Sequence, residues 1–355
     1  MAVAVDLGSR SYSVHFGTLD TSGELTASLE LRKKSVVITD DLVGSLYAER
    51  VLDSLRSANI DVSQITVAAG EKSKSLATAE SILNAMAQAG LDRSSSVIAL
   101  GGGVIGDLAG FVASIYFRGI PYIQIPTTVL AQVDSSIGGK TGVNLASGKN
   151  LVGSFHQPRA VLVDVTTLHS LPEREFNEGC AEIIKHAIIR DADLFEKLKI
   201  FDRSNIKKLT SIIQRNIEIK AEIVSQDETE ILGLRALLNF GHTIGHGIEN
   251  AAGYGAMLHG EAISLGMLAA ARLSLANARL PQKDFDAIEA MLVQFQLPTK
   301  LPETISTESI LTAMGKDKKF SGGAIRFVLT PGIGDAFLSS HIGMEDIRRE
   351  IEALR

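Results

Sequence analysis

Three of the chain's eight histidines fall between residues 242 and 259, close enough in sequence to act on one ion or one substrate. His242 and His246 are four residues apart in NFGHTIGH, so on a helix they lie one turn apart on the same face. Glu182, in GCAEIIKH, adds a carboxylate on a predicted helix, three residues before Lys185. Imidazole and carboxylate are zinc ligands, and three protein ligands with one open position are typical of catalytic sites. Spacing alone favours His242 and His246 as ligands and leaves open whether His246 moves a proton instead.

A glycine-rich turn indicates a second kind of chemistry, the binding of a nucleotide. Residues 101–107 read GGGVIGD, which satisfies G-x-G-x-x-G between a predicted strand and a predicted helix. Glycines let the backbone approach a pyrophosphate, and the helix N-terminus offers free N–H groups. The turn follows the third predicted strand and no ribose carboxylate is evident downstream, so a tight strand–helix turn stays an alternative. Residues 70–74 could bind the ligand or form a solvated loop, and Asp40 could bind a ribose hydroxyl or cap the next helix.

Cationic side chains in the same chain suggest an anionic substrate. The stretch QIPTTVLAQVDSSIGGKTGVNLASGKN, residues 124–150, holds Asp134, Lys140, Lys149 and Asn150. Asp134 stands in apolar or small sequence, which is costly for a charge unless it is paired or functional. Further positive charge comes from Arg118, Lys220, Arg235 and the group at residues 316–319. If several converge, they suit a phosphorylated or carboxylated small molecule, whereas any one of them alone is more simply a solvated surface charge.

Composition excludes several classes of protein. The chain has 355 residues, 45% hydrophobic and 21% charged, which predicts a folded protein of two domains. A net charge of −6 argues against nucleic-acid or anionic-membrane binding, which needs a basic face. The single cysteine, Cys180, excludes a disulfide framework and a multi-thiolate metal site. The first residues lack a signal-peptide pattern and the apolar stretch Val97–Phe117 carries Asp107, so we expect a cytoplasmic protein without a membrane segment.

The elements that must position these residues change in kind near Pro172. Before it, short apolar runs alternate with helical stretches, the pattern of an α/β domain with a mainly parallel sheet. The predicted strands are Ser35–Thr39, Ile65–Ala69, Ser96–Leu100, Pro121–Ile125 and Ala160–Val165, and the predicted helices are Asp41–Ser57, Leu76–Ala89 and Leu108–Tyr116.

After Pro172 the sequence predicts long helices with few strands. The helices are Glu173–Ile189, Asn205–Val224, Leu237–Ala251, Gly260–Ala278 and Phe285–Phe295, and the strands are Ala324–Thr330 and Asp335–Ser340. We therefore predict an N-terminal Rossmann-like α/β domain over residues 1–172 and a mostly α-helical domain over residues 173–355.

Seven strings, in this order along the chain, resemble the 3-dehydroquinate synthases of the sugar phosphate cyclase superfamily. They are GGGVIGDLAGFVAS, RGIPYIQIPTTVLAQVDSSIGGKTGVN, GKNLVGSFHQP, EGCAEIIKH, RALLNFGHTIGH, LHGEAISLGM and KDKKFSGGAIRFVL. Together with Glu71 and Lys74 they are spread over residues 71–329. One departure is that Lys220 and Arg235 stand one residue further apart than is usual in the family.

The resemblance implies a dehydroquinate synthase-like fold, a bound NAD and a divalent metal, zinc or cobalt. It assigns the metal to Glu182, His242 and His259, which removes His246 from the ligand pair. NAD would contact Asp40, Glu71, Lys74, Gly102, Gly103, Val104, Asp107, Thr127, Thr128, Leu130, Lys149 and Ser170. A small phosphorylated sugar-acid substrate would contact Asp134, Lys140, Asn150, Lys185, Lys220, Arg235, Asn239, His246 and Lys318. Arg118 would act across the interface of a homodimer.

The resemblance also implies a lyase of the shikimate pathway, which converts 3-deoxy-D-arabino-heptulosonate 7-phosphate to 3-dehydroquinate and phosphate. Transient oxidation by NAD, phosphate β-elimination, re-reduction and intramolecular aldol closure would follow one another, so the cofactor is regenerated. One alternative is another cyclase, which makes 2-epi-5-epi-valiolone or 2-deoxy-scyllo-inosose. A second is a metal-dependent polyol dehydrogenase, which would consume NAD. A non-catalytic nucleotide-binding regulator would lack a metal ligand or Lys140, and this chain has both.

Overall fold

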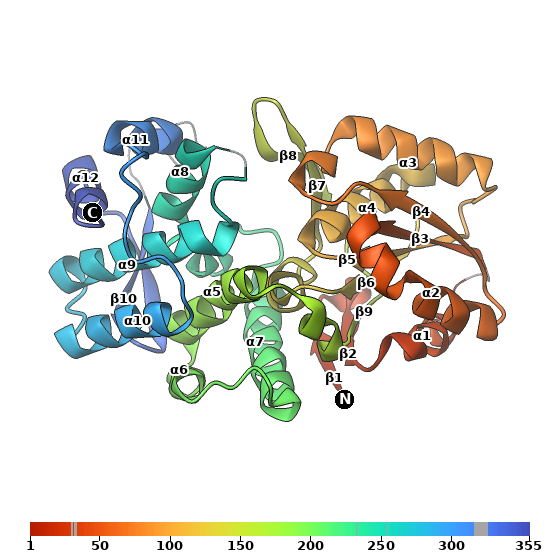
Figure 1. The fold of residues 1–355 in the computed structure, drawn as a ribbon, viewed down its shortest axis with the longest axis horizontal. Coiled ribbons are helices and arrows are strands. Elements are labelled where there is room, and N and C mark those ends of the chain that lie inside the picture. The colour runs from red at the N-terminus through yellow and green to blue at the C-terminus, as the bar shows by residue number, and fades with distance from the viewer. Residues whose placement is uncertain (30, 32–33, 232, 254, 316–325) are drawn as a thin grey trace. The chain divides into compact units, whose positions relative to one another are not determined.

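The computed structural model of the chain divides into two compact units (Figure 1). It describes residues 1–29, 31, 34–231, 233–253, 255–315 and 326–355. The first unit comprises Met1–Leu171 and Lys220–Thr229, and the second comprises Pro172–Ile219 and Glu230–Arg355. The contacts thus group Lys220–Thr229 with the first unit, whereas the sequence placed this segment in the helical domain.

A seven-stranded sheet forms the centre of the first unit, in the order β1-β2-β9-β6-β5-β3-β4. Its strands are β1 (Ala2–Val5), β2 (Tyr12–Phe16), β3 (Lys34–Asp40), β4 (Asp61–Val67), β5 (Ser96–Gly101), β6 (Tyr122–Pro126) and β9 (Ala160–Val163). Among the described strands of this sheet, β1 and β2 form the only antiparallel pair, so the predicted mainly parallel α/β fold is confirmed. The sequence prediction missed β1 and β2, which span only four and five residues, although the alternation of apolar and polar residues in β2 was a usable signal.

Helices bury both faces of this sheet. They are α1 (Ser22–Ser28), α2 (Asp41–Ser57), α3 (Leu76–Gln88) and α4 (Gly103–Ile115). Because successive strand residues point to opposite faces, Val36 and Ile38 pack in a core with α3 and α4 residues, whereas Val37 packs in another with α2 residues. Each fully buried aliphatic side chain contributes roughly 1.5–3 kcal/mol. The two cores hold the carboxyl ends of the strands, and the turns that follow them, in fixed positions.

A separate β-hairpin in the first unit carries several predicted site residues. It consists of β7 (Lys140–Leu145) and β8 (Gly148–Phe155), preceded by a π-helical turn at Ala131–Ser135. The hairpin was not predicted, because its sequence is rich in glycine and polar residues rather than apolar runs. Its strands approach closely: a Cβ on Gly153 would lie 2.1 Å from the carbonyl oxygen of Thr141.

The second unit is mostly helical, as predicted. Its helices are α5 (Glu173–Arg190), α6 (Ala192–Lys199), α7 (Ile206–Gln226, whose last residues belong to the first unit), α8 (His242–Ala252), α9 (His259–Asn277), α10 (Gln282–Gln294), α11 (Thr307–Gly315) and α12 (Met344–Glu352). Helix α9 is central and packs against α5, α8, α10 and α12. A two-stranded sheet of β10 (Phe327–Gly332) and β11 (Asp335–Ser339) completes the unit.

One predicted helix is wrong in its first turn. The sequence predicted a continuous helix over Leu237–Ala251, but the chain breaks at Gly241, whose φ is +77°. A 3-10 turn at Arg235–Asn239 precedes the break, and α8 begins at His242. Glycine adopts this left-handed conformation without steric cost, so it ends the turn and aims the first residue of α8. Among the described residues we find no helix with the length and apolar composition that a membrane crossing requires.

Candidate functional site

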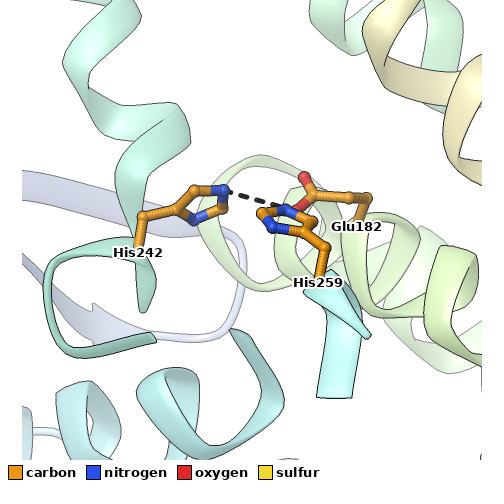
Figure 2. Close-up of side chains that lie close together, drawn as sticks. All are labelled: Glu182, His242 and His259. Atoms are coloured by element: carbon orange, nitrogen blue, oxygen red, sulfur yellow. Dashed lines mark ion pairs between the residues drawn. The ribbon is translucent and has the colours of Figure 1, made fainter. Parts of the chain in front are cut away.

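Three side chains in the second unit converge around one buried carboxylate oxygen (Figure 2). Glu182 comes from the middle of α5, and His242 and His259 are the first residues of α8 and α9. Oε1 of Glu182 lies 3.4 Å from Nε2 of His242 and 3.5 Å from Nε2 of His259. This oxygen is fully buried and has no hydrogen-bond partner among the described residues. The structure thus brings together the three residues that the family resemblance assigned to the metal.

The separations within this group fit a shared divalent cation. Two ligands about 2.1 Å from a tetrahedral zinc ion stand about 3.4 Å apart, which is the spacing seen here. A buried acceptor without a partner is costly, and an ion bonded to it would remove that cost. Two imidazoles and one carboxylate also form a donor set that leaves a fourth position open for a substrate oxygen.

Charges around Glu182 keep it in the form that binds a cation. Lys185, one turn further along α5, forms an ion pair with Oε2 of Glu182 inside the unit. Burial alone would raise the pKa of the Glu182 carboxyl, but Lys185 and the two imidazoles lower that pKa well below its usual range. For His242, burial and the Lys185 charge both lower the pKa of the ring well below its usual value, so the ring is neutral. Burial opposes a charge on His259 too, but the nearby carboxylates of Glu182 and Glu249 outweigh it and raise that pKa to about 10.

Glycines at two helix contacts let the three ligand residues meet. A Cβ on Gly266 of α9 would lie 2.0 Å from the carbonyl oxygen of Gly241, so α8 and α9 touch through their backbones. A Cβ on Gly260 would lie 1.9 Å from the carbonyl oxygen of Glu178, so the start of α9 touches α5. Only glycine permits these approaches, and each adjoins a candidate ligand, His242 or His259.

In each of the two candidate histidine ligands, the second ring nitrogen, Nδ1, has its own partner. Nδ1 of His242 lies 3.1 Å from the carbonyl oxygen of Phe240, and Nδ1 of His259 lies 3.3 Å from Oε2 of Glu249. Such contacts fix the ring orientation and tautomer, and they leave Nε2 to face the shared oxygen. Sequence reasoning missed Glu249, although its position three residues after His246 on α8 was a usable signal.

His246 lies beside this cluster, and its ring does not join the Glu182 carboxylate in a candidate metal group as those of His242 and His259 do. Its ring centroid is 5.1 Å from that of His242 and 5.8 Å from that of His259. Its ligand atom groups with those of Glu249 and His259, whereas the ligand atom of His242 groups with Glu182. The i, i+4 spacing therefore places two imidazoles near one another but does not by itself select the pair that meets the carboxylate.

Three further site residues were predicted in the second unit: Arg235, Asn239 and Lys318. Arg235 is buried and Asn239 half-buried, on the 3-10 turn that leads to Gly241, and this turn packs against α5. Lys318 lies outside the described residues.

In the first unit, the glycine turn after β5 brings the predicted cofactor residues together. Gly102 precedes α4, and Gly103 and Val104 are its first residues. A Cβ on Gly102 would lie 3.0 Å from the Thr128 side chain, so the turn is tight. Lys74 forms a 2.5 Å ion pair with Asp107, on the second turn of α4. Burial raises the pKa of the Asp107 carboxyl even against the Lys74 charge.

Other predicted cofactor residues surround neighbouring strand ends. The carboxylate of Asp40, at the end of β3, accepts from the backbone N–H groups of Leu42 and Val43, so it caps α2. Thr127 follows β6, and its buried hydroxyl has no hydrogen-bond partner in the part of the chain that the structure describes. Ser170 shares a 2.6 Å hydrogen bond with the hydroxyl of Tyr47. The remaining members are Glu71 on a 3-10 turn, Leu130 just before the π-helical turn and Lys149 on β8.

The predicted substrate residues of the first unit include a paired charge. Nζ of Lys220 lies 2.7 Å from Oδ1 of Asp134 and also bonds the carbonyl oxygen of the same residue. The aspartate in apolar sequence is therefore neutralised by a lysine that is 86 residues away along the chain. Lys140 begins β7, and Asn150 on β8 has a φ of +56°. Arg118 also has a left-handed backbone, with a φ of +68°.

The chain combines an α/β unit that bears a glycine turn with a helical unit that bears a candidate three-ligand cation site. The family model of the 3-dehydroquinate synthase N-terminal region matches residues 64–178, and that of the C-terminal region matches residues 179–320. A 3-dehydroquinate synthase of Desulforamulus reducens is 46% identical over 351 residues, which cover 97% of this chain and 98% of that protein. The chain belongs to the 3-dehydroquinate synthase family.

Two solved cyclases share the fold. The 2-epi-5-epi-valiolone synthase of Streptomyces hygroscopicus subsp. jinggangensis, solved with NAD⁺ and Zn²⁺ bound, is 29% identical with a TM-score of 0.89, over 97% of this chain and 96% of its own. A 2-deoxy-scyllo-inosose synthase, solved with carbaglucose-6-phosphate, NAD⁺ and Co²⁺, is 28% identical with a TM-score of 0.89, over 100% of both chains. The predicted dehydroquinate synthase-like fold is thus confirmed.

Proposed function

We propose that the chain converts 3-deoxy-D-arabino-heptulosonate 7-phosphate to 3-dehydroquinate and phosphate, with NAD and a divalent metal, as a phosphate-eliminating lyase. The observation that carries this proposal is the unpartnered Oε1 of Glu182 between His242 and His259, in a chain of the 3-dehydroquinate synthase family. When bound, these groups supply hydride transfer and Lewis-acid polarisation of a substrate oxygen.

Glu182, His242 and His259 hold the metal in this proposal, and Lys185 tunes them. The Lys185 ammonium balances the Glu182 charge from the side opposite the shared oxygen, since it bonds Oε2. That pairing leaves Oε1 directed at the imidazoles. Lys185 is also assigned a hydrogen bond to a substrate hydroxyl, and His246, which stands beside both imidazoles, is assigned the movement of a proton.

We assign NAD to the first unit, on the glycine turn. The backbone of Gly102 and Gly103 and the N-terminus of α4 favour a pyrophosphate, as in other nucleotide-binding turns. Lys74 offsets the Asp107 carboxylate there, which reduces repulsion of an anionic cofactor. Thr127 supports the same assignment, because none of the described residues forms a hydrogen bond with its buried hydroxyl.

An anionic substrate is supported by the positive side chains assigned to it. Lys140, Lys220, Arg235 and Lys318 are assigned its phosphate and carboxylate, with Asn150 and Asn239 as hydrogen-bond partners. The Asp134–Lys220 pair is assigned the ring hydroxyls, because it offers an acceptor and a donor side by side. The cytoplasmic location and the homodimer with Arg118 at its interface are parts of this proposal.

Product identification tests the proposal. Purified protein is incubated with NAD⁺, Zn²⁺ and the heptulosonate phosphate, and released phosphate and organic products are measured by NMR. We expect equal amounts of phosphate and 3-dehydroquinate. A valiolone- or inosose-type carbocycle formed from another sugar phosphate, with the heptulosonate phosphate left unused, would contradict the proposal and favour one of the other cyclases.

A further inference from the structure

Asn144 makes three hydrogen bonds that join separate parts of the first unit. Its backbone N–H donates to the carbonyl oxygen of Lys74 over 2.8 Å. Its side-chain Nδ2 donates to Oε1 of Glu71 over 2.7 Å. Its Oδ1 accepts from the backbone N–H of Asn150 over 2.9 Å. One residue of the β7–β8 hairpin therefore contacts the Glu71–Lys74 turn and the opposite strand of its own hairpin.

The backbone at Asn144 is released from the hairpin to make this contact. The register of β7 and β8 shifts between Val143 and Leu145, so Asn144 stands at an irregularity of the ladder. It forms an isolated bridge with Ser75 instead. Such irregularities redirect a residue out of the regular pairing, and here the redirected N–H reaches Lys74.

The residues that Asn144 contacts belong to two functional groups. Glu71 and Lys74 are assigned to NAD, and Lys74 continues the network to Asp107. Asn150 is assigned to the substrate, and its left-handed backbone, with a φ of +56°, costs free energy unless its surroundings hold it. The bond from its N–H to Asn144 is one such constraint.

The chemistry of the side chain matches these two tasks. A carboxamide donates and accepts at once, so asparagine can bond the Glu71 carboxylate and the Asn150 N–H together. An aspartate in its place would keep the acceptor but would set a second negative charge against Glu71. A leucine of similar size would keep neither bond.

We infer that Asn144 is a positioning residue that couples the cofactor-binding turn to the substrate-binding strand. The inference rests on the proposed function, because it takes the roles of Glu71, Lys74 and Asn150 from it. Asn144 acts through these residues and aligns them for NAD and for the substrate.

A double-mutant cycle between Asn144 and Glu71 tests the inference. Asn144→Asp, Asn144→Leu, Glu71→Gln and the double variant Glu71→Gln/Asn144→Asp are compared with wild type. Asn84→Asp, on an exposed position of α3, is the matched control for the charge change. The Kd of NAD⁺ is measured by calorimetry, KM and kcat by phosphate release, and Tm by thermal unfolding.

We expect Asn144→Asp to raise the Kd of NAD⁺ about 10-fold in wild type, but less than about 3-fold in the Glu71→Gln background. The swapped pair again has one donor and one acceptor, so the second background rescues the substitution. Asn144→Leu should also raise the substrate KM about 10-fold with a smaller change in kcat, because it frees the Asn150 N–H. Asn84→Asp should change none of these values.

Two results would overturn the inference alone: Kd and KM within about 2-fold of wild type in both Asn144 variants, or a loss without rescue that follows a lowered Tm. The second would mean that Asn144 only supports the fold. A wild-type protein that fails to bind NAD⁺ would overturn the proposed function and the inference with it, so the two failures are distinguishable.

Discussion

Asp107 in the first unit and Glu182 in the second each form an ion pair with a lysine, but their pKa values are shifted in opposite directions. Asp107 pairs with Lys74 at the glycine turn, yet burial still raises the pKa of Asp107. Glu182 pairs with Lys185, and that charge together with two imidazoles lowers the pKa of Glu182 well below its usual range. The surroundings thus give one functional group two roles: a carboxylate whose charge a lysine offsets suits a turn that receives an anion, and an ionised one whose second oxygen has no hydrogen-bond partner among the described residues suits a cation.

Removal of the ionised carboxylate should have the largest effect. In Glu182→Gln, the amide keeps the size of the side chain but loses the negative charge that a divalent ion requires. We expect loss of bound metal and a fall in kcat of at least about 1,000-fold, measured as metal content by elemental analysis and as phosphate release. Glu303→Gln, at an exposed position, is the control. A Glu182→Gln protein that keeps both metal and activity would refute the ligand assignment.

Substitution of His246 should distinguish a role in binding the metal ion from a role in moving a proton. Because its ligand atom does not group with Glu182, His246→Gln should keep the metal content of wild type. A proton-moving role predicts a fall in kcat of about 100-fold and the loss of one limb of its pH profile. Loss of metal in this variant would instead make His246 a ligand, as the spacing alone first suggested.

Lys74 tests the other side of the comparison. In Lys74→Met, the Asp107 carboxylate loses its partner at the turn, so we expect the Kd of NAD⁺ to rise about 10-fold in a calorimetric titration while metal content stays unchanged. Lys72→Met, two residues earlier and exposed, is the matched control. Equal effects of the two substitutions would indicate a general charge effect rather than the Lys74–Asp107 pair.

The smallest expected effect is the release of protons when the metal ion binds. The raised pKa of His259, about 10 against an ordinary 6.5, means that the metal-free protein keeps its ring protonated at neutral pH. Stability from that charge is fully present below about pH 6.5 and is lost as the pH rises toward 10. An ion must displace the proton on Nε2, so Zn²⁺ binding at neutral pH should release about one proton, measurable by calorimetry in buffers of different ionisation enthalpy. An affinity independent of pH between about 6 and 9 would contradict this.

Sequence patterns captured the elements whose apolar residues form a continuous run or recur at helical spacing. The buried strand β5 (Ser96–Gly101) and the helix α5 (Glu173–Arg190) were predicted as Ser96–Leu100 and Glu173–Ile189, close to their observed bounds. The β7–β8 hairpin was missed, because glycine contacts and hydrogen bonds to Asn144 hold it rather than an apolar pattern.

The candidate metal group was harder to derive from sequence. Local spacing relates residues on one helix, and it therefore identified His242 with His246 and Glu182 with Lys185. The meeting of α5, α8 and α9 depends on backbone contacts at Gly241 and Gly260, which no local pattern reveals. Family resemblance supplied that tertiary information, whereas the contact between Glu249 and His259 is visible only in the folded chain.

The amounts of NADH and phosphate formed during turnover of the heptulosonate phosphate are the decisive measurement for the proposed reaction. If Glu182, His242 and His259 hold an ion for a reaction in which the hydride is taken and returned, phosphate accumulates steadily while the nicotinamide absorbance stays constant. NADH that accumulates in step with substrate consumption would show a dehydrogenase and contradict the account.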